Sequence, residues 1–149
     1  MTLEPTLDFD WTATFEELAA ESKEKVWKLD DVFSKDASLD FTRRFLPEAL
    51  TGEAGATFLA ERDRLRLNQI TGKSYLNLFY FVEEYIIRDT ERMESVADEA
   101  SGEKAALGRF VAEEVKHQAL FQRVMTAFDK GYDGTTAVLD FADDVADLI

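Results

Sequence analysis

The chain has 149 residues, the size of one domain, and its hydrophobic fraction of 46% with 12 Phe supplies enough apolar material for a core. A net charge of −14 argues against nucleic acid or an anionic membrane surface as a partner, because phosphate recognition needs clustered Lys and Arg. The sequence contains no cysteine, which excludes disulfides, thiolate metal sites and thiol catalysis.

No targeting or membrane-spanning segment is visible in the sequence. The N-terminus lacks a basic stretch followed by an apolar one, which is the pattern of a secretory signal. The longest apolar run, residues 76–87, is interrupted by Asn77 and by the adjacent Glu83 and Glu84, so it is too short and too charged to cross a bilayer. We therefore expect a cytoplasmic protein in which residues 1–149 form a single helical domain.

The predicted elements are all helices. The sequence has 2 prolines, and no run of alternating β-branched residues indicates a strand. Thr14, followed three residues later by Glu17, is a capping-box pattern that predicts a helix from there to about Phe33. Residues 36–40 are turn-like, and a short helix is expected from Phe41 to near residue 47.

Two long helices are expected after the loop at residues 51–55. The first covers about residues 56–93, and Gly72 inside it predicts a kink or a tight helix crossing, because glycine costs roughly 1 kcal/mol relative to alanine in a helix interior. A break at residues 100–102 precedes the second, which extends to about Asp129. The short polar turn between the two helices predicts that they pack antiparallel.

The C-terminal part of the sequence predicts a loop at residues 130–136 and a last helix. Apolar residues recur there at helical spacing, namely Val138, Phe141, Val145 and Ile149. Residues 129–140 also match part of a calcium-binding EF-hand loop, with Asp129, Asp133, Gly134 and Asp140 at ligand or turn positions. Gly131 and Thr136 depart from that pattern, so a calcium-binding module is a minor alternative.

Glu83 lies in the middle of an apolar stripe of the first long helix. At about 100° per residue it shares a face with Leu76 and Phe79, whereas Glu84 shares a charged face with Arg88. A carboxylate on an apolar face needs a partner, because an isolated buried charge is very costly, and a metal ion is one such partner. Glu84 is expected to face water.

The one histidine, His117, follows Glu114 by three residues on the second long helix. A Glu-x-x-His pair on one helix face offers a metal ion a carboxylate oxygen and an imidazole nitrogen. Glu83 lies about as far before the turn as Glu114 and His117 lie after it, so the three side chains should meet at the same height. Glu113 is expected to accept a hydrogen bond beside the site or to face solvent.

These residues resemble the ferritin-like superfamily of carboxylate-bridged di-metal proteins. The resemblance covers about residues 65–128 and rests on Glu83 and on the run Glu-Glu-Val-Lys-His at residues 113–117. In that family two helices each supply one Glu and two supply Glu-x-x-His. The resemblance implies an all-α, ferritin-like helix bundle with a long central antiparallel helix pair. It also implies that Glu83 and Glu114 bind or bridge two iron or manganese ions and that His117 binds one of them.

The resemblance further implies a function in oxygen chemistry. Sites of this kind activate dioxygen, so we expect an oxygen-dependent oxidoreductase that acts on an unknown small-molecule substrate. Phe79, Phe110 and Phe121 would then line a dry pocket beside the metal ions. Iron oxidation and storage is an alternative function of the same site.

The chain departs from the family pattern in containing a single Glu-x-x-His. Either a two-fold homodimer assembles the complete ligand set across its interface, or the chain is the N-terminal half of a longer ferritin-like protein. A third interpretation needs no metal: Glu114 and His117 bond to each other in a helical interaction domain.

Overall fold

The computed structural model describes residues 11–24, 26–100, 102–134 and 136, and these form helices and connecting turns with no strand among them. The helices are α1 (Trp11–Glu24), α2 (Leu29–Val32), α3 (Glu48–Thr51), the 3-10 helix η1 (Glu53–Gly55), α4 (Glu61–Val96) and α5 (Glu103–Gly131). The all-α prediction is confirmed for this part of the chain.

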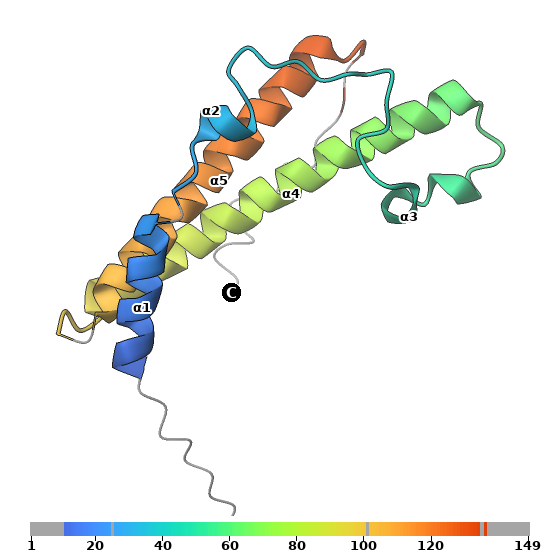
Figure 1. Cartoon of the computed structure of the whole chain (residues 1–149). Coiled ribbons are helices and arrows are strands. Elements are labelled where there is room, and N and C mark those ends of the chain that lie inside the picture. Colours follow the sequence, from blue (N-terminus) through green and yellow to red (C-terminus); the bar gives the residue numbers. More distant parts are fainter. Residues whose placement is uncertain (1–10, 25, 101, 135, 137–149) are drawn as a thin grey trace, which may run out of the picture.

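Helices α4 and α5 form the frame of the molecule. They pack against each other as a hairpin joined by residues 97–102, and they diverge toward the end where α4 begins (Figure 1). Gly102 adopts φ 76°, a left-handed conformation that glycine tolerates best, and it precedes the first residue of α5. The predicted long antiparallel pair is therefore confirmed, whereas a ferritin-like bundle remains an expectation.

The prediction of one helix from Thr14 to Phe33 is wrong. Helix α1 already includes Trp11, so Thr14 lies inside it, and α1 ends at Glu24. Lys28 is extended, and the short helix α2 begins after it. The break brings Trp27 to α5, where its indole N–H donates a hydrogen bond to Glu113 (2.9 Å). A tertiary contact thus accompanies a break that local helix propensity does not predict.

The predicted short helix from Phe41 to near Pro47 is also wrong, because residues 41–46 form turns and α3 follows Pro47. Two buried amides of α4 bind the backbone of these turns. Asn68 Oδ1 accepts hydrogen bonds from the amides of residues 45 and 46 (2.9 and 3.1 Å), and its Nδ2 donates to the carbonyl of residue 46 (2.9 Å). Gln69 Nε2 donates to the carbonyls of residues 41 and 43 (2.8 and 3.0 Å). These bonds satisfy backbone amides and carbonyls of residues 41–46, which in a helix would bond to one another.

Gly72 explains how the turns approach α4 so closely. A Cβ atom built on Gly72 would lie 3.3 Å from the Cβ of Phe45, a distance that requires the neighbour to move. Helix α4 continues without interruption across this position. The predicted tight crossing is present in another form, because the crossing segment is the turn at residues 41–46 rather than a helix.

The remaining boundaries differ from the predictions by a few residues. Helix α4 begins at Glu61 instead of residue 56 and ends at Val96 instead of residue 93, and α5 extends to Gly131. The predicted last helix, which begins at Val138, lies outside the described residues.

The apolar core lies where α5 ends, not along the middle of the helix pair. Phe128 is 1% exposed and is surrounded by the rings of Phe41, Phe45 and Tyr132 at centroid distances of 4.8–6.1 Å. Farther along the pair, large apolar side chains are exposed to solvent: Leu78, Phe79, Val82, Phe110 and Val115. The middle of the helix pair therefore presents apolar surface that the described residues do not cover.

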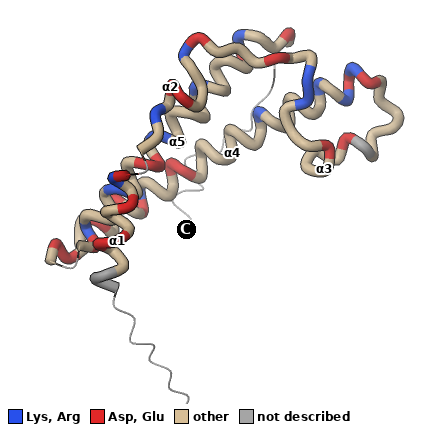
Figure 2. The backbone as a smooth tube through the Cα atoms, in the orientation of Figure 1, with Lys and Arg blue, Asp and Glu red and all other residues tan. Residues whose placement is uncertain are grey.

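Charge and helix composition bear on possible partners. Lys and Arg alternate with Asp and Glu along the described backbone in the view of Figure 2, and no continuous basic stripe is seen there. No helix in the described part of the chain combines the length and apolar character that crossing a bilayer requires.

Candidate metal centre

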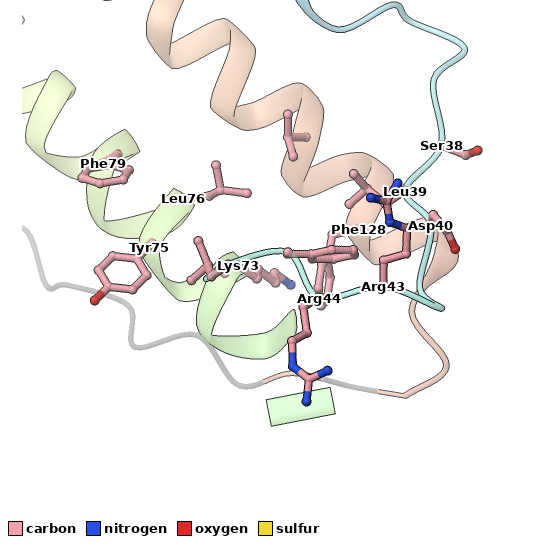
Figure 3. A pocket seen from close by; sticks show the side chains of 14 residues that line it. Ser38, Leu39, Asp40, Arg43, Arg44, Lys73, Tyr75, Leu76, Phe79 and Phe128 are labelled. Atoms are coloured by element: carbon pink, nitrogen blue, oxygen red, sulfur yellow. The ribbon is translucent and has the colours of Figure 1, made fainter. Parts of the chain in front are cut away.

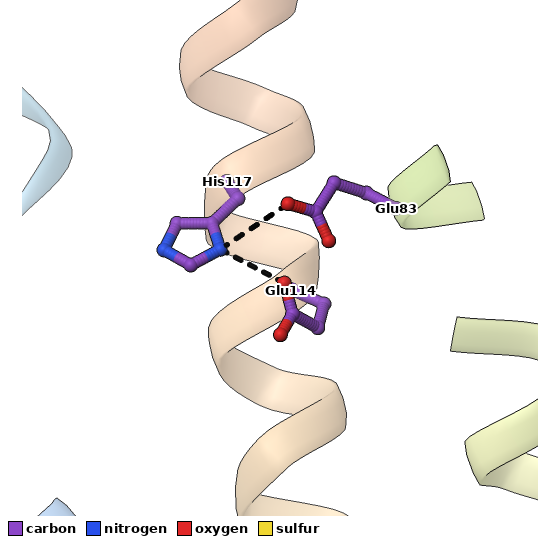
Figure 4. A group of neighbouring side chains, drawn as sticks. All are labelled: Glu83, Glu114 and His117. Atoms are coloured by element: carbon purple, nitrogen blue, oxygen red, sulfur yellow. Dashed lines mark hydrogen bonds and ion pairs between the residues drawn. The ribbon is translucent and has the colours of Figure 1, made fainter. Parts of the chain in front are cut away.

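Glu83, Glu114 and His117 form one cluster between the two long helices. Glu83 projects from α4, and Glu114 and His117 project from α5 (Figure 4). One potential ligand atom from each residue lies within 4.8 Å of the other two. His117 Nδ1 is 2.8 Å from Glu114 Oε2 and 3.6 Å from Glu83 Oε1. The structure thus brings together the three residues that the sequence singled out.

Helix geometry explains this convergence. Residues three apart lie on one face of an α-helix, so Glu114 and His117 project from neighbouring turns. The hairpin between α4 and α5 then sets the height at which Glu83 meets them. The cluster therefore depends on one i,i+3 spacing and one short connection, and both are encoded locally.

The two carboxylates of the cluster are largely shielded from water. The side chain of Glu114 is 9% exposed and that of Glu83 is 16% exposed, whereas His117 is 38% exposed. The pKa of Glu83 is raised to about 7, first by burial and then by the hydrogen bond and charge of Glu114, against the opposing effect of His117. In the absence of a cation, a proton between the two carboxylates relieves their repulsion. A divalent ion at this position would relieve it more completely.

Glu113 points to a different set of partners. Its Oε2 accepts a hydrogen bond from Trp27 Nε1 (2.9 Å), and its Oε1 accepts one from Lys116 Nζ (2.6 Å). The pKa of Glu113 is lowered, chiefly by the hydrogen bond from Lys116. Glu113 is thus not part of the cluster and accepts hydrogen bonds beside it, in line with one of the two expectations for this residue.

Trp27 is the neighbour of the cluster that sequence reasoning missed. Its ring stacks on the imidazole of His117 with a centroid distance of 5.7 Å and an interplanar angle of 17°. Lys116 Nζ lies 5.0 Å from the centroid of the Trp27 ring, in cation–π geometry. No spacing in the sequence indicated this contact, because Trp27 reaches α5 only through the break between α1 and α2.

The structure also shows where the other residues that were predicted near the site lie. Glu84 forms a surface ion pair with Arg88 (2.5 Å), which confirms that it faces water. Phe121 lies between the cluster and Phe79, with its centroid 6.4 Å from that of His117 and 5.9 Å from that of Phe79. Phe79 and Phe110 are 47% and 46% exposed. This side of the cluster is therefore open in the described chain, and the dry pocket remains a prediction that needs further residues to cover it.

The possible calcium loop is only partly described, since Asp140 lies outside the described residues. Asp129 is still helical and forms an ion pair with Lys73, and the backbone carbonyl of Asp133 accepts a hydrogen bond from Arg66 (2.7 Å). Within the described ranges, the metal-ligand cluster that emerges is the one at His117, not one in this segment.

The chemistry of the donor set is well defined. One imidazole nitrogen and two carboxylates form a set that accepts Fe²⁺, Mn²⁺ or Zn²⁺, and three protein ligands leave open coordination positions. The carboxylates also allow bridging to a second ion. The described residues thus fit one divalent ion directly and a pair of ions when further ligands approach from the open side.

Comparison with known proteins identifies no relative. No protein family model matches the chain, and no curated protein sequence or solved structure is significantly similar to it.

Proposed function

We propose that this chain holds iron or manganese at Glu83, Glu114 and His117, as part of a ferritin-like di-metal protein that uses dioxygen. The observation that carries the proposal is the convergence of one imidazole nitrogen and two shielded carboxylates, from two antiparallel helices, within 4.8 Å of one another. Ligand atoms at such distances from one another are a suitable starting arrangement for a single coordination sphere.

The residues have distinct roles in this proposal. His117 binds through Nδ1, the nitrogen that faces both glutamates, and the stacked ring of Trp27 limits how its imidazole can rotate. Glu114 binds the same ion, and Glu83 brings the carboxylate of the opposite helix. A reduced iron or manganese ion held by these residues would supply the electrons for dioxygen chemistry. Phe79 and Phe121 form an apolar wall beside the cluster.

A second ion requires ligands that approach from outside the cluster. A second copy of the chain, related by a two-fold axis, would supply another Glu83, Glu114 and His117. A further segment of a longer protein would supply equivalent residues. The exposed apolar side chains at the middle of the helix pair, including Phe79, Val82 and Phe110, support either arrangement because both would cover them.

Native mass spectrometry after anaerobic loading with ferrous iron tests the proposal. We expect the chain to retain iron, and the variants Glu83→Gln and His117→Ala to lose it while keeping their helical circular dichroism. The matched control is Glu84→Gln, one residue away but paired with Arg88 on the surface, which should retain iron. Equal iron content in Glu83→Gln and Glu84→Gln would refute the assignment.

The mass of the loaded species separates the possible assemblies. A dimer that carries two irons supports completion by a second copy, and a monomer with one iron supports completion by a further segment. Uptake of many ferrous ions for each chain in air would instead indicate iron oxidation and storage. If the chain retains zinc in preference to iron or manganese, it does not carry out dioxygen chemistry at this site, because Zn²⁺ is not redox-active.

One observation favours a metal-free alternative. The hydrogen bond of 2.8 Å between His117 and Glu114 is complete without an ion, so the pair can serve as an internal contact of a helical interaction domain. That function predicts no retained metal in any variant and no effect of chelators on the unfolding midpoint.

A further inference from the structure

A cavity of about 470 Å³ lies between α4, α5 and the turns at residues 38–46 (Figure 3). Most of its wall is apolar, and the side chains that form this part include Leu39, Phe45, Leu76, Phe79, Val124 and Phe128. A volume of this size is in the range of small-molecule sites, which run from roughly 300 to 1,000 Å³. The cavity is separate from the metal-ligand cluster, which contributes none of its lining residues.

The cavity and the cluster share a wall. Phe79 lines the cavity and precedes Glu83 by four residues, which is about 6 Å along the helix axis. The ring of Phe79 also contacts Phe121, which in turn stacks on His117. A molecule in the cavity therefore lies along the same apolar face of the helix pair that leads to the cluster.

Three cationic side chains line the cavity, and two of them, Lys73 and Arg44, have ion-pair partners within the protein. The third, Arg43, is exposed, and its charge adds to the hydrogen bonds from Thr42 that lower the pKa of Asp40, which also lines the cavity. Lys73, which is 7% exposed, forms an ion pair with Asp129 and donates a hydrogen bond to Thr136 Oγ1 (2.8 Å). Arg44 donates to the carboxylates of Glu53 (2.5 Å) and Glu61 (2.7 Å). A ligand carboxylate would have to compete with these internal acids for Lys73 and Arg44. An uncharged ligand leaves the ion pairs intact and places apolar surface against the wall.

We propose that this cavity binds an uncharged aromatic or aliphatic small molecule and presents it along Phe79 and Phe121 to the metal cluster. The binding of such a molecule is independent of any metal. Its role as the substrate rests on the proposed function.

Two matched probes test the chemical class, namely 2-naphthol, which is neutral at pH 7, and 2-naphthoate, its anionic counterpart. We expect 2-naphthol to cause saturable shifts of the backbone amide resonances of residues 72–79 and 124–128 in an NMR titration of the full chain. We expect 2-naphthoate to bind at least about tenfold more weakly, because the apolar wall would desolvate its charge while Lys73 and Arg44 are already paired with internal acids. Equal or tighter binding of 2-naphthoate, or no saturable binding of 2-naphthol, would overturn the proposal.

Cavity-filling variants locate the site. Leu76→Trp places a large ring in the cavity and should weaken 2-naphthol binding at least about tenfold. Leu78→Trp is the matched control, because Leu78 is on the same helix but 40% exposed and outside the cavity lining. Val124→Phe fills the cavity from α5 and provides an independent variant if Leu76→Trp does not fold. Unchanged binding in a folded filling variant, or an equal loss in Leu78→Trp, would contradict the location.

A third measurement separates this inference from the proposed metal function. Bound Mn²⁺ should broaden the proton signals of bound 2-naphthol, and the Glu83→Gln variant should bind 2-naphthol without that broadening. Absence of broadening in the Mn²⁺-loaded wild-type protein would overturn the substrate role. If no metal binds at all, the proposed function and the substrate role are refuted together, and the 2-naphthol titration still decides whether the cavity binds its ligand.

Discussion

One end of the helix pair and its middle differ in how their buried polar groups are satisfied. At one end, which we call the clamped end, Asn68 and Gln69 bind the turns at residues 41–46 beside the buried ring of Phe128. In the middle, which we call the open centre, the carboxylates of Glu83 and Glu114 lie close together, and the neighbouring Phe79 is half exposed. The clamped end has the features of a region that stabilises the fold. The open centre has those of a region that costs stability and serves a ligand.

The largest expected effect tests the clamped end. Asn68→Ala removes three hydrogen bonds to the backbone of residues 45 and 46 and leaves those groups unpaired next to the core. We expect the free energy of unfolding to fall by about 3 kcal/mol, measured by urea denaturation. The control is Asn77→Ala, whose amide only donates to the carbonyl of Lys73 within its own helix (3.0 Å) and whose loss should change stability little. Similar losses of stability in both variants would show that the hydrogen bonds of Asn68 to residues 45 and 46 stabilise the fold no more than a hydrogen bond within one helix.

The second prediction concerns the stability cost of the open centre. Glu83→Leu replaces a shielded carboxylate that has another carboxylate as its neighbour, so it should stabilise the metal-free protein by about 1 kcal/mol. The same variant should lose metal binding. Urea denaturation in the presence of a chelator measures the first effect, with Glu84→Leu as the surface control. A destabilised Glu83→Leu protein would mean that Glu83 supports the fold, and the contrast between the two regions would fail.

The third prediction concerns Trp27, which we regard as a positioning residue for His117. Trp27→Ala removes both the ring stacked on the imidazole and the hydrogen bond to Glu113, and it should weaken metal affinity at least about tenfold. Trp27→Phe keeps an aromatic ring and should recover part of that loss. The visible absorption spectrum of the Co²⁺-loaded protein reports the ligand geometry directly, which a general loss of stability would not alter. Identical affinities and spectra in all three proteins would exclude the positioning role.

The sequence predicted the open centre better than it predicted the clamped end, and the reason is the range of the interactions. The meeting of Glu83 with Glu114 and His117 follows from helix periodicity and one short turn, which are local properties. The turns at residues 41–46 are held instead by amides more than twenty positions away in the sequence. The break before Trp27 is likewise associated with a contact to α5. Such contacts leave no periodic signal, so residues 14–33 and 41–47 were wrongly expected to be continuous helices.

The last prediction is a dependence of stability on pH that arises in the open centre. The pKa of Glu83 is raised from 4.5 to about 7 in the folded chain, so between these values the folded state holds a proton that the unfolded state has released. The metal-free protein should therefore lose stability as the pH rises through this window, by at most about 1.4 kcal/mol for each pH unit. About one pH unit above 7 the folded state is ionised as well, and the loss is complete.

The contribution of Glu83 is isolated by subtracting the unfolding free energy of Glu83→Gln from that of the wild type at each pH, because the other titrating groups are common to both proteins. We expect the difference in unfolding free energy between wild type and Glu83→Gln, measured by urea denaturation with a chelator, to change from pH 5 to about pH 8 and then to level off. Saturating Mn²⁺ should abolish the change, since a bound cation holds Glu83 ionised at both ends of the window. Parallel profiles without metal would show that the two carboxylates do not compete for a proton. The open centre would then lack the repulsion between carboxylates that favours a bound cation and distinguishes it from the clamped end.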